Sequence, residues 1–169
     1  FKRSTGHYKV ITNISFEFFE TVCVVMDQMY DFYQDVYGYN KKAPPVTLAI
    51  HRKRSDFDRY CQAELGQSLP LGVGGWFYDK EMTVAAYDRT ESGRDLTDLW
   101  RVLFHEASHQ FMYLTVEKKT KQDPPPWLNE GTASYFEGCE LKPDGTIIKN
   151  KPALNRLREW EYIERSDER

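Results

Sequence analysis

The pentapeptide H-E-A-S-H, from His105 to His109, contains two histidines and a glutamate at a spacing that suits metal chemistry. Residues four apart lie on the same face of an α-helix, so both imidazoles can point at one Zn²⁺ ion. Glu106 stands beside them, where a carboxylate can take a proton from metal-activated water. The alternative is a pair of helix histidines that pack or face water. A third ligand would decide between the two interpretations.

The residues around the motif predict the helix that it needs. Neither Gly nor Pro occurs between Asp95 and Gln122. Apolar residues recur there at helical spacing: Leu96, Leu99, Leu103, Ala107 and Phe111. The motif therefore belongs to one face of an amphipathic helix.

Downstream acids that could supply the third ligand are Glu117, Asp123, Glu130, Glu137 and Glu140. Glu117 ends the same helix and is not expected to fold back, while Asp123 lies in a proline-bounded loop that is typical of a turn. Glu130 begins the next helix, after a loop long enough to reverse direction, and Glu137 lies two turns further on the same face. Glu130 could also be a first-turn acid that favours the helix dipole. Spacing alone leaves these alternatives open.

The two motifs H-E-A-S-H-Q and W-L-N-E-G-T-A-S-Y-F-E resemble those of gluzincin metallopeptidases. They are similar to aminopeptidase N-type enzymes and, over more of the chain, to the peptidase-MA-like family known as domain of unknown function 1570. The resemblance implies a zincin-like domain with one Zn²⁺ held by His105, His109 and Glu130. It also implies that Glu106 is the catalytic base and that water takes the fourth position on the metal.

Three departures from related enzymes narrow this resemblance. Metzincins require Gly and His where this chain has Met112 and Thr115, so that group is excluded. Aminopeptidase N-type enzymes carry an acid on the strand before the zinc helix, but G-G-W-F-Y has none, and cleavage of internal peptide bonds is therefore expected. Ser134 replaces the Asp with which thermolysin-like enzymes orient a ligand histidine, so that contact must be weaker or supplied elsewhere.

Other residues are candidates for contacts with substrate. The predicted strand at Gly74, Gly75, Trp76 and Tyr78 could offer its edge to an extended peptide, although the glycines could equally form a bulge or turn. Ser134 and Tyr135 are candidates for second-shell or oxyanion contacts. Tyr87 and Tyr162 are further candidates for the oxyanion group that gluzincins place downstream of the third ligand.

The hydrophobic pattern predicts an α+β fold, with a small mixed sheet segregated from several helices. A stripe of Phe18, Val22, Val25, Met29, Phe32 and Val36 predicts a helix that ends at Gly38, and Ser55 or Asp56 should cap a short helix that ends at Gly66. The predicted strands cover 7–12, 44–53 and two segments within 74–88, with a hairpin over 141–149. The remaining helices are the metal-binding one, 126–138 and a charged one over 152–165.

Composition limits the class of protein. The 169 residues suit a single domain, expected to be a mature form or a domain excised from a longer protein. The net charge of −3, from 23 basic and 26 acidic residues, gives no indication of nucleic-acid binding, and no apolar run suggests a membrane span. Cys23, Cys61 and Cys139 form no disulfide framework, although a Cys61–Cys139 bridge stays open. Localisation is undecided, with a secreted or cell-envelope site favoured over the cytoplasm.

Two classes of function follow. The first is a zinc-dependent peptidase that acts on a peptide or protein substrate. The alternative is a zincin-like domain that binds a peptide or protein partner with weak catalysis or none. A further alternative is a structural metal site or a plain scaffold domain, which predicts metal-independent behaviour and no open coordination position.

Overall fold

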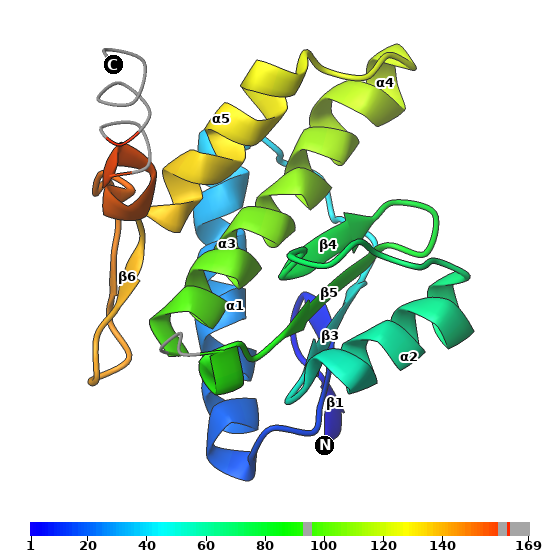
Figure 1. Ribbon diagram of the computed structural model, residues 1–169. Helices are drawn as coiled ribbons and strands as arrows, with labels where there is room; N and C mark the ends of the chain where they lie inside the picture. Colours follow the sequence, from blue (N-terminus) through cyan, green and yellow to red (C-terminus); the bar gives the residue numbers. More distant parts are fainter. Residues whose placement is uncertain (93–95, 159–161, 163–169) are drawn as a thin grey trace.

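A five-stranded mixed sheet lies beside the helix that carries the H-E-x-x-H motif, in a computed structural model that describes residues 1–92, 96–158 and 162 (Figure 1). The strand order is β1-β2-β3-β5-β4; the central β2, β3 and β5 are parallel, and β1 and β4 pair antiparallel at the two edges. The strands are β1 Lys2–Ser4, β2 Tyr8–Thr12, β3 Val46–His51, β4 Gly75–Tyr78 and β5 Thr83–Tyr87. The predicted α+β class is confirmed, and β1 is an addition that the sequence did not predict.

Helices cover both faces of the sheet. Successive side chains of a strand point to opposite faces, so one strand can contribute to both cores. On β5, Val84 and Ala86 join the main core with α1 and α3. Ala85 and Tyr87 point the other way and pack with Phe57 of helix α2. The site helix α3 therefore lies on the larger of the two cores.

Helix α1, Phe16–Tyr37, follows the predicted stripe. The hydroxyl of Ser15 accepts a hydrogen bond from the Phe18 backbone at the start, and Gly38 ends the helix in the left-handed conformation. The stripe prediction is wrong at Val36, which is 43% exposed because it lies in the last turn, at the rim of the core.

Helix α2, Arg54–Leu65, ends at Gly66 as predicted. The predicted cap at Ser55 or Asp56 is wrong, because the helix already begins at Arg54. Its N-cap is Lys53, which makes no side-chain cap hydrogen bond.

The site helix is longer than one regular α-helix. α3, Leu96–Met112, continues into the π-helical segment η2, Tyr113–Glu117, and the short α4, Lys118–Thr120. Its predicted apolar face is buried except for Leu96, which is 40% exposed in the first turn. Helix α5, Pro126–Glu137, then runs back beside α3 (Figure 1).

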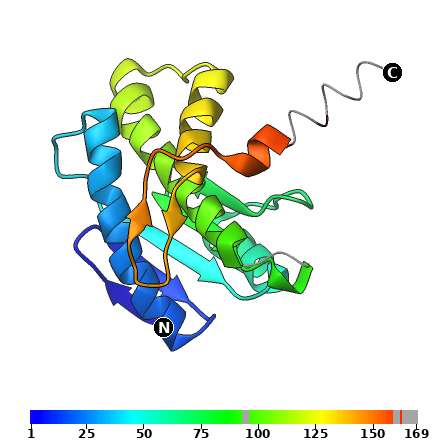
Figure 2. The same cartoon turned by 90° about the vertical axis from the view of Figure 1, so that its left-hand side faces the viewer.

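The C-terminal part begins with the predicted hairpin, β6 Glu140–Leu141 and β7 Ile147–Ile148, which lies beside α1 (Figure 2). Residues 154–158 are helical, and most of the rest of the helix predicted over 152–165 lies outside the described residues. The short 3-10 turn η1 covers Thr90–Ser92.

The cysteines Cys23, Cys61 and Cys139 are all buried and unpaired, so the open Cys61–Cys139 bridge is not formed. Cys61 belongs to the cluster under α2 and Cys139 to the main core, which places them in separate layers. Within the described residues, no helix is long and apolar enough to cross a membrane.

Edge strand β4 packs closely on α3 because Gly75 has no side chain. A Cβ atom there would lie 2.5 Å from Cγ1 of Val102 and 3.0 Å from Cγ of Glu106. The glycine is therefore a packing requirement for bringing the sheet edge next to the H-E-x-x-H motif.

We predict that Gly75→Ala lowers the free energy of unfolding by about 1–3 kcal/mol, because an added methyl group overpacks the contact with Val102. Gly131→Ala is the matched control, since a Cβ atom at that position of α5 meets nothing within 4 Å. It should raise stability by about 0.5–1 kcal/mol through helix propensity. Urea unfolding measures both; equal effects of the two substitutions would contradict the packing role of Gly75.

Candidate metal centre

Three side chains from α3 and α5 converge on one point. Nε2 of His105 lies 3.2 Å from Oε2 of Glu130, and Nε2 of His109 lies 3.7 Å from Oε1 of the same carboxylate. One ligand atom from each of the three residues lies within 4.8 Å of the others, so the group could bind one metal ion. The two histidines are largely buried, whereas the side chain of Glu130 is 59% exposed.

The separations suit the ion that the motif predicts. Zinc–nitrogen and zinc–oxygen bonds are about 2.0–2.2 Å, which places tetrahedral ligands about 3.3–3.6 Å apart. The distances from the two histidine nitrogens to the Glu130 carboxylate bracket that range. The nitrogen and oxygen donor set, without cysteine, is typical of a catalytic rather than a structural zinc site.

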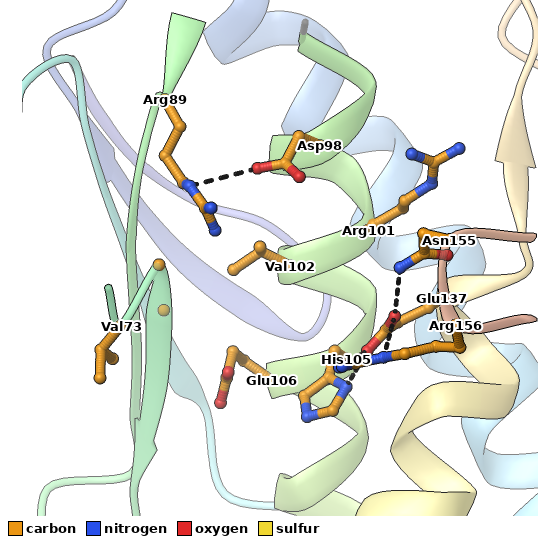
Figure 3. Close-up of a pocket in the computed structure, with 12 residues that line it drawn as sticks. Val73, Arg89, Asp98, Arg101, Val102, His105, Glu106, Glu137, Asn155 and Arg156 are labelled. Atoms are coloured by element: carbon orange, nitrogen blue, oxygen red, sulfur yellow. Dashed lines mark hydrogen bonds and ion pairs between the residues drawn. The ribbon is translucent and has the colours of Figure 1, made fainter. Parts of the chain in front are cut away.

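The other nitrogen of each histidine is held by a residue of α5. Nδ1 of His105 lies 2.6 Å from Oε1 of Glu137, and Nδ1 of His109 lies 2.9 Å from Oδ1 of Asn129 (Figure 3 shows the former pair). The amide oxygen of Asn129 and the ionised carboxylate of Glu137 can only accept hydrogen bonds, so Nδ1 of each histidine donates. In the neutral form of each ring, Nε2 then keeps its lone pair for a metal ion. Such partners fix the ring orientation that a metal ligand needs.

Glu137 is itself held by the C-terminal segment. Arg156 donates from Nε at 3.0 Å and from Nη2 at 2.7 Å, and Asn155 donates from Nδ2 at 3.0 Å (Figure 3). Burial raises the pKa of Glu137, but the hydrogen bonds from His105, Arg156 and Asn155 outweigh it and lower the pKa to about 2. The carboxylate therefore stays ionised and is a permanent acceptor for His105.

Glu106 points toward the sheet edge rather than toward α5. Its Oε2 accepts a hydrogen bond of 3.0 Å from the backbone N–H of Phe77 on β4. Burial raises its pKa to about 7, against the opposing effects of His105 and of that hydrogen bond. A divalent cation beside it would favour the carboxylate form and lower this pKa.

The two histidines differ in their protonation equilibria. Burial alone would lower the pKa of His105, but its hydrogen bond with Glu137 and the nearby carboxylates raise it overall. Burial and the neighbouring His105 lower the pKa of His109. Their rings lie 4.8 Å apart at 78°, so each presents Nε2 to the common point from a different direction.

Two cavities meet at His105 and Glu106. One of about 310 Å³, here called the arginine cavity, extends toward Arg89 and Arg101. The other of about 320 Å³, here called the acidic cavity, extends toward Asp79 and Glu117 and includes Glu130. The two cavities together are here called the cleft; His105 and Glu106 line both of them, whereas His109 and Glu130 line the acidic cavity and not the arginine cavity.

Most of the predicted substrate residues reach this cleft. Gly74 and Gly75 line the arginine cavity, and Trp76 lines the acidic cavity. Tyr78 instead packs with Phe57 in the cluster under α2. Packing explains Gly75 but not Gly74, where a Cβ atom would lie 2.7 Å from Nη1 at the flexible end of Arg89, a group that can shift.

The residues proposed for second-shell or oxyanion contacts lie elsewhere. The hydroxyl of Tyr135 donates to Asn150, and its ring packs against Phe32 of α1. Tyr87 packs under α2, and Ser134 is half-buried on α5 outside both cavities. The histidine-orienting contact expected at Ser134 is supplied by Glu137, three residues later.

Four residues near the histidines were not assigned these roles from the sequence: Asn129, Glu137 as a partner of His105, Asn155 and Arg156. Only Asn129 had a sequence signal, its position next to Glu130.

Cleavage of internal peptide bonds was expected because G-G-W-F-Y contains no acid. That reason is incomplete, because Asp79 and Glu117 place carboxylates in the acidic cavity.

Residues 100–169 match a family described as protein of unknown function (DUF1570). The matched range contains the metal group, the Glu137–Arg156 pair and the β6–β7 hairpin, but not the five-stranded sheet. It agrees, for this part of the chain, with the resemblance that the two motifs carry. No curated protein matches the chain.

We predict that Arg156→Ala weakens zinc binding by about 10–100-fold, because Glu137 loses the donors that hold it against His105. Arg158→Ala, on the same helical segment and exposed, is the matched control and should bind zinc like the unmodified protein. Competition with a zinc-binding dye measures both affinities, with circular dichroism to confirm that each variant is folded. Equal affinities for the two variants would show that the Arg156 pair does not support the metal ligands.

Proposed function

We propose that this protein is a zinc-dependent peptidase of the gluzincin type, with a zincin-like catalytic domain. The observation that carries the proposal is the convergence of His105, His109 and Glu130 beside the Glu106 carboxylate, at the edge of a strand. Metal ligands, a carboxylate that can accept a proton and a strand edge for the substrate backbone are parts that a zinc peptidase uses.

Bound zinc would supply Lewis acidity, which activates water and polarises a carbonyl group. His105, His109 and Glu130 would hold the ion, with the ring orientations fixed by Glu137 and Asn129. Glu106 takes a proton from the attacking water and delivers it to the nitrogen of the leaving amine. The hydrogen bond from Phe77 holds Glu106 in place before substrate binds.

The edge of β4 would bind the substrate backbone. The N–H of Phe77 points away from β5, because it donates to Glu106. Alternate residues of an antiparallel strand face the same side, so the backbone groups of Gly75 face this edge as well. An extended peptide that pairs there would pass the metal group with chain on either side.

A second candidate is a zincin-like domain that binds peptides without efficient catalysis. It is favoured by one observation: among the described residues, no tyrosine lines either cavity, so the oxyanion group that gluzincins use has no equivalent there. Cavity arginines could replace it. Activity measurements separate the two candidates.

We predict one zinc ion per chain. His109→Ala should lose the ion, because it removes one of three protein ligands. Elemental analysis of the purified proteins measures the occupancy. Full zinc occupancy in the His109→Ala variant would overturn the ligand assignment.

We predict that Glu106→Gln keeps its zinc and loses peptide hydrolysis, with kcat lower by about 100-fold or more, because the side chain can no longer accept a proton. Glu64→Gln, an exposed glutamate of α2, is the matched control and should retain full activity. Mass spectrometry of a digested peptide library measures both. Equal cleavage by the two variants would mean that Glu106 is not the base.

A further inference from the structure

Three arginines line the arginine cavity, and among the described residues one of them has no counter-charge. Nε of Arg89 lies 3.4 Å from Oδ2 of Asp98, and Arg156 is bound to Glu137. Within the described part of the chain, Arg101 has no hydrogen-bond or ion-pair partner, although it lines the same cavity (Figure 3). It stands one helical turn before His105 on α3, and its guanidinium points away from His105 (Figure 3), so it can bind a carboxylate that lies in this cavity beyond the metal group.

The acidic cavity has the opposite charge. It is lined by Asp79, from the turn after β4, and by Glu117, and neither carboxylate has a hydrogen bond or ion pair with another described residue. Burial and the neighbouring carboxylates of Asp123 and Asp79 raise the pKa of Glu117. An arriving cation would relieve this repulsion.

The π-helical segment explains how Glu117 reaches this cavity. A regular α-helix turns about 100° per residue, which would leave Glu117 about 80° away from the direction of His109. A π-helix has more residues per turn, so η2 turns less per residue and brings Glu117 back toward the His109 face. Glu117 therefore reaches the acidic cavity without any reversal of the helix that carries it.

The direction of β4 relates these charges to the direction of a bound peptide. β4 runs from Gly75, at the arginine cavity, to Tyr78, which precedes Asp79 at the acidic cavity. Antiparallel pairing is slightly the more stable arrangement. A peptide paired in that way has its N-terminal part at Asp79 and Glu117 and its C-terminal part at Arg101.

We propose that the cleft selects peptides by charge and direction, binding a cationic group N-terminal to the metal group at Asp79 and Glu117 and an anionic group C-terminal to it at Arg101. The proposal rests on the proposed function, since it assumes that a peptide occupies this cleft. The cation is either a basic side chain or the α-ammonium group, which share the chemistry that these carboxylates recognise.

The test uses two eight-residue peptides of identical composition, both acetylated and amidated. One has Lys near its N-terminus and Glu near its C-terminus, and in the other the two are exchanged. Their affinities for the zinc-loaded Glu106→Gln protein are measured by calorimetry, so that binding is read without hydrolysis. We expect about tenfold tighter binding of the Lys-first peptide, the combined effect of two partly exposed ion pairs.

Variants assign this preference to its residues. Arg101→Gln and Glu117→Gln should each reduce the ratio to about threefold, because each removes one of two ion pairs. Arg59→Gln is the matched control, since Arg59 lies on α2 outside both cavities with its side chain 75% exposed. Its ratio should equal that of the Glu106→Gln protein alone.

A third peptide without charged side chains, with its amino terminus free or acetylated, identifies the source of the cation. Tighter binding of the free form assigns the acidic cavity to the α-ammonium group, whereas a gain only with Lys assigns it to a side chain. Equal binding of all forms, or tighter binding of the Glu-first peptide, would overturn the proposal. Hydrolysis by the unmodified enzyme is scored separately: a directional binding preference without any cleavage would overturn the peptidase function and leave the charge selection standing.

Discussion

The antiparallel packing of α5 against α3 is the constraint on which the site depends. It places Asn129 beside His109, Glu137 beside His105 and Glu130 between the two histidines, in the register of two helices that run in opposite directions. One helix thus contributes a potential metal ligand and both ring-orienting partners. A shift of this packing by one turn would separate each histidine from its partner.

The packing of α5 against α3 buries charged side chains, and burial of a charge destabilises the folded state unless the charge is paired. The side chain of Glu137 is only 5% exposed, and it is stabilised by His105 on one side and Arg156 on the other. The C-terminal segment therefore belongs to the metal centre, although it contributes no ligand to the group. Gly75 makes the corresponding contribution on the sheet side, where the absence of a side chain lets β4 reach Glu106.

Much of this structure follows from local pattern. The stripe of α1, the H-E-x-x-H face of α3 and the hairpin predicted over 141–149 depend on residues that are neighbours in the chain, so the sequence predicts them. Periodicity could not separate Glu130 from Glu137, because residues seven apart share a helix face. The structure separates them through packing: Glu130 is exposed on the Nε2 side of the histidines, and Glu137 is buried on the Nδ1 side of His105. Arg156 and Glu117 were missed for related reasons, since one depends on long-range docking and the other on a local π-helical turn.

The most direct test of the metal centre is a crystal structure of the zinc-loaded protein with anomalous scattering measured at the zinc absorption edge. We expect one strong peak about 2.0–2.2 Å from Nε2 of His105, Nε2 of His109 and a carboxylate oxygen of Glu130, with Glu137 still bound to Nδ1 of His105. A peak at Glu137 instead of Glu130, or none near the two histidines, would contradict this expectation.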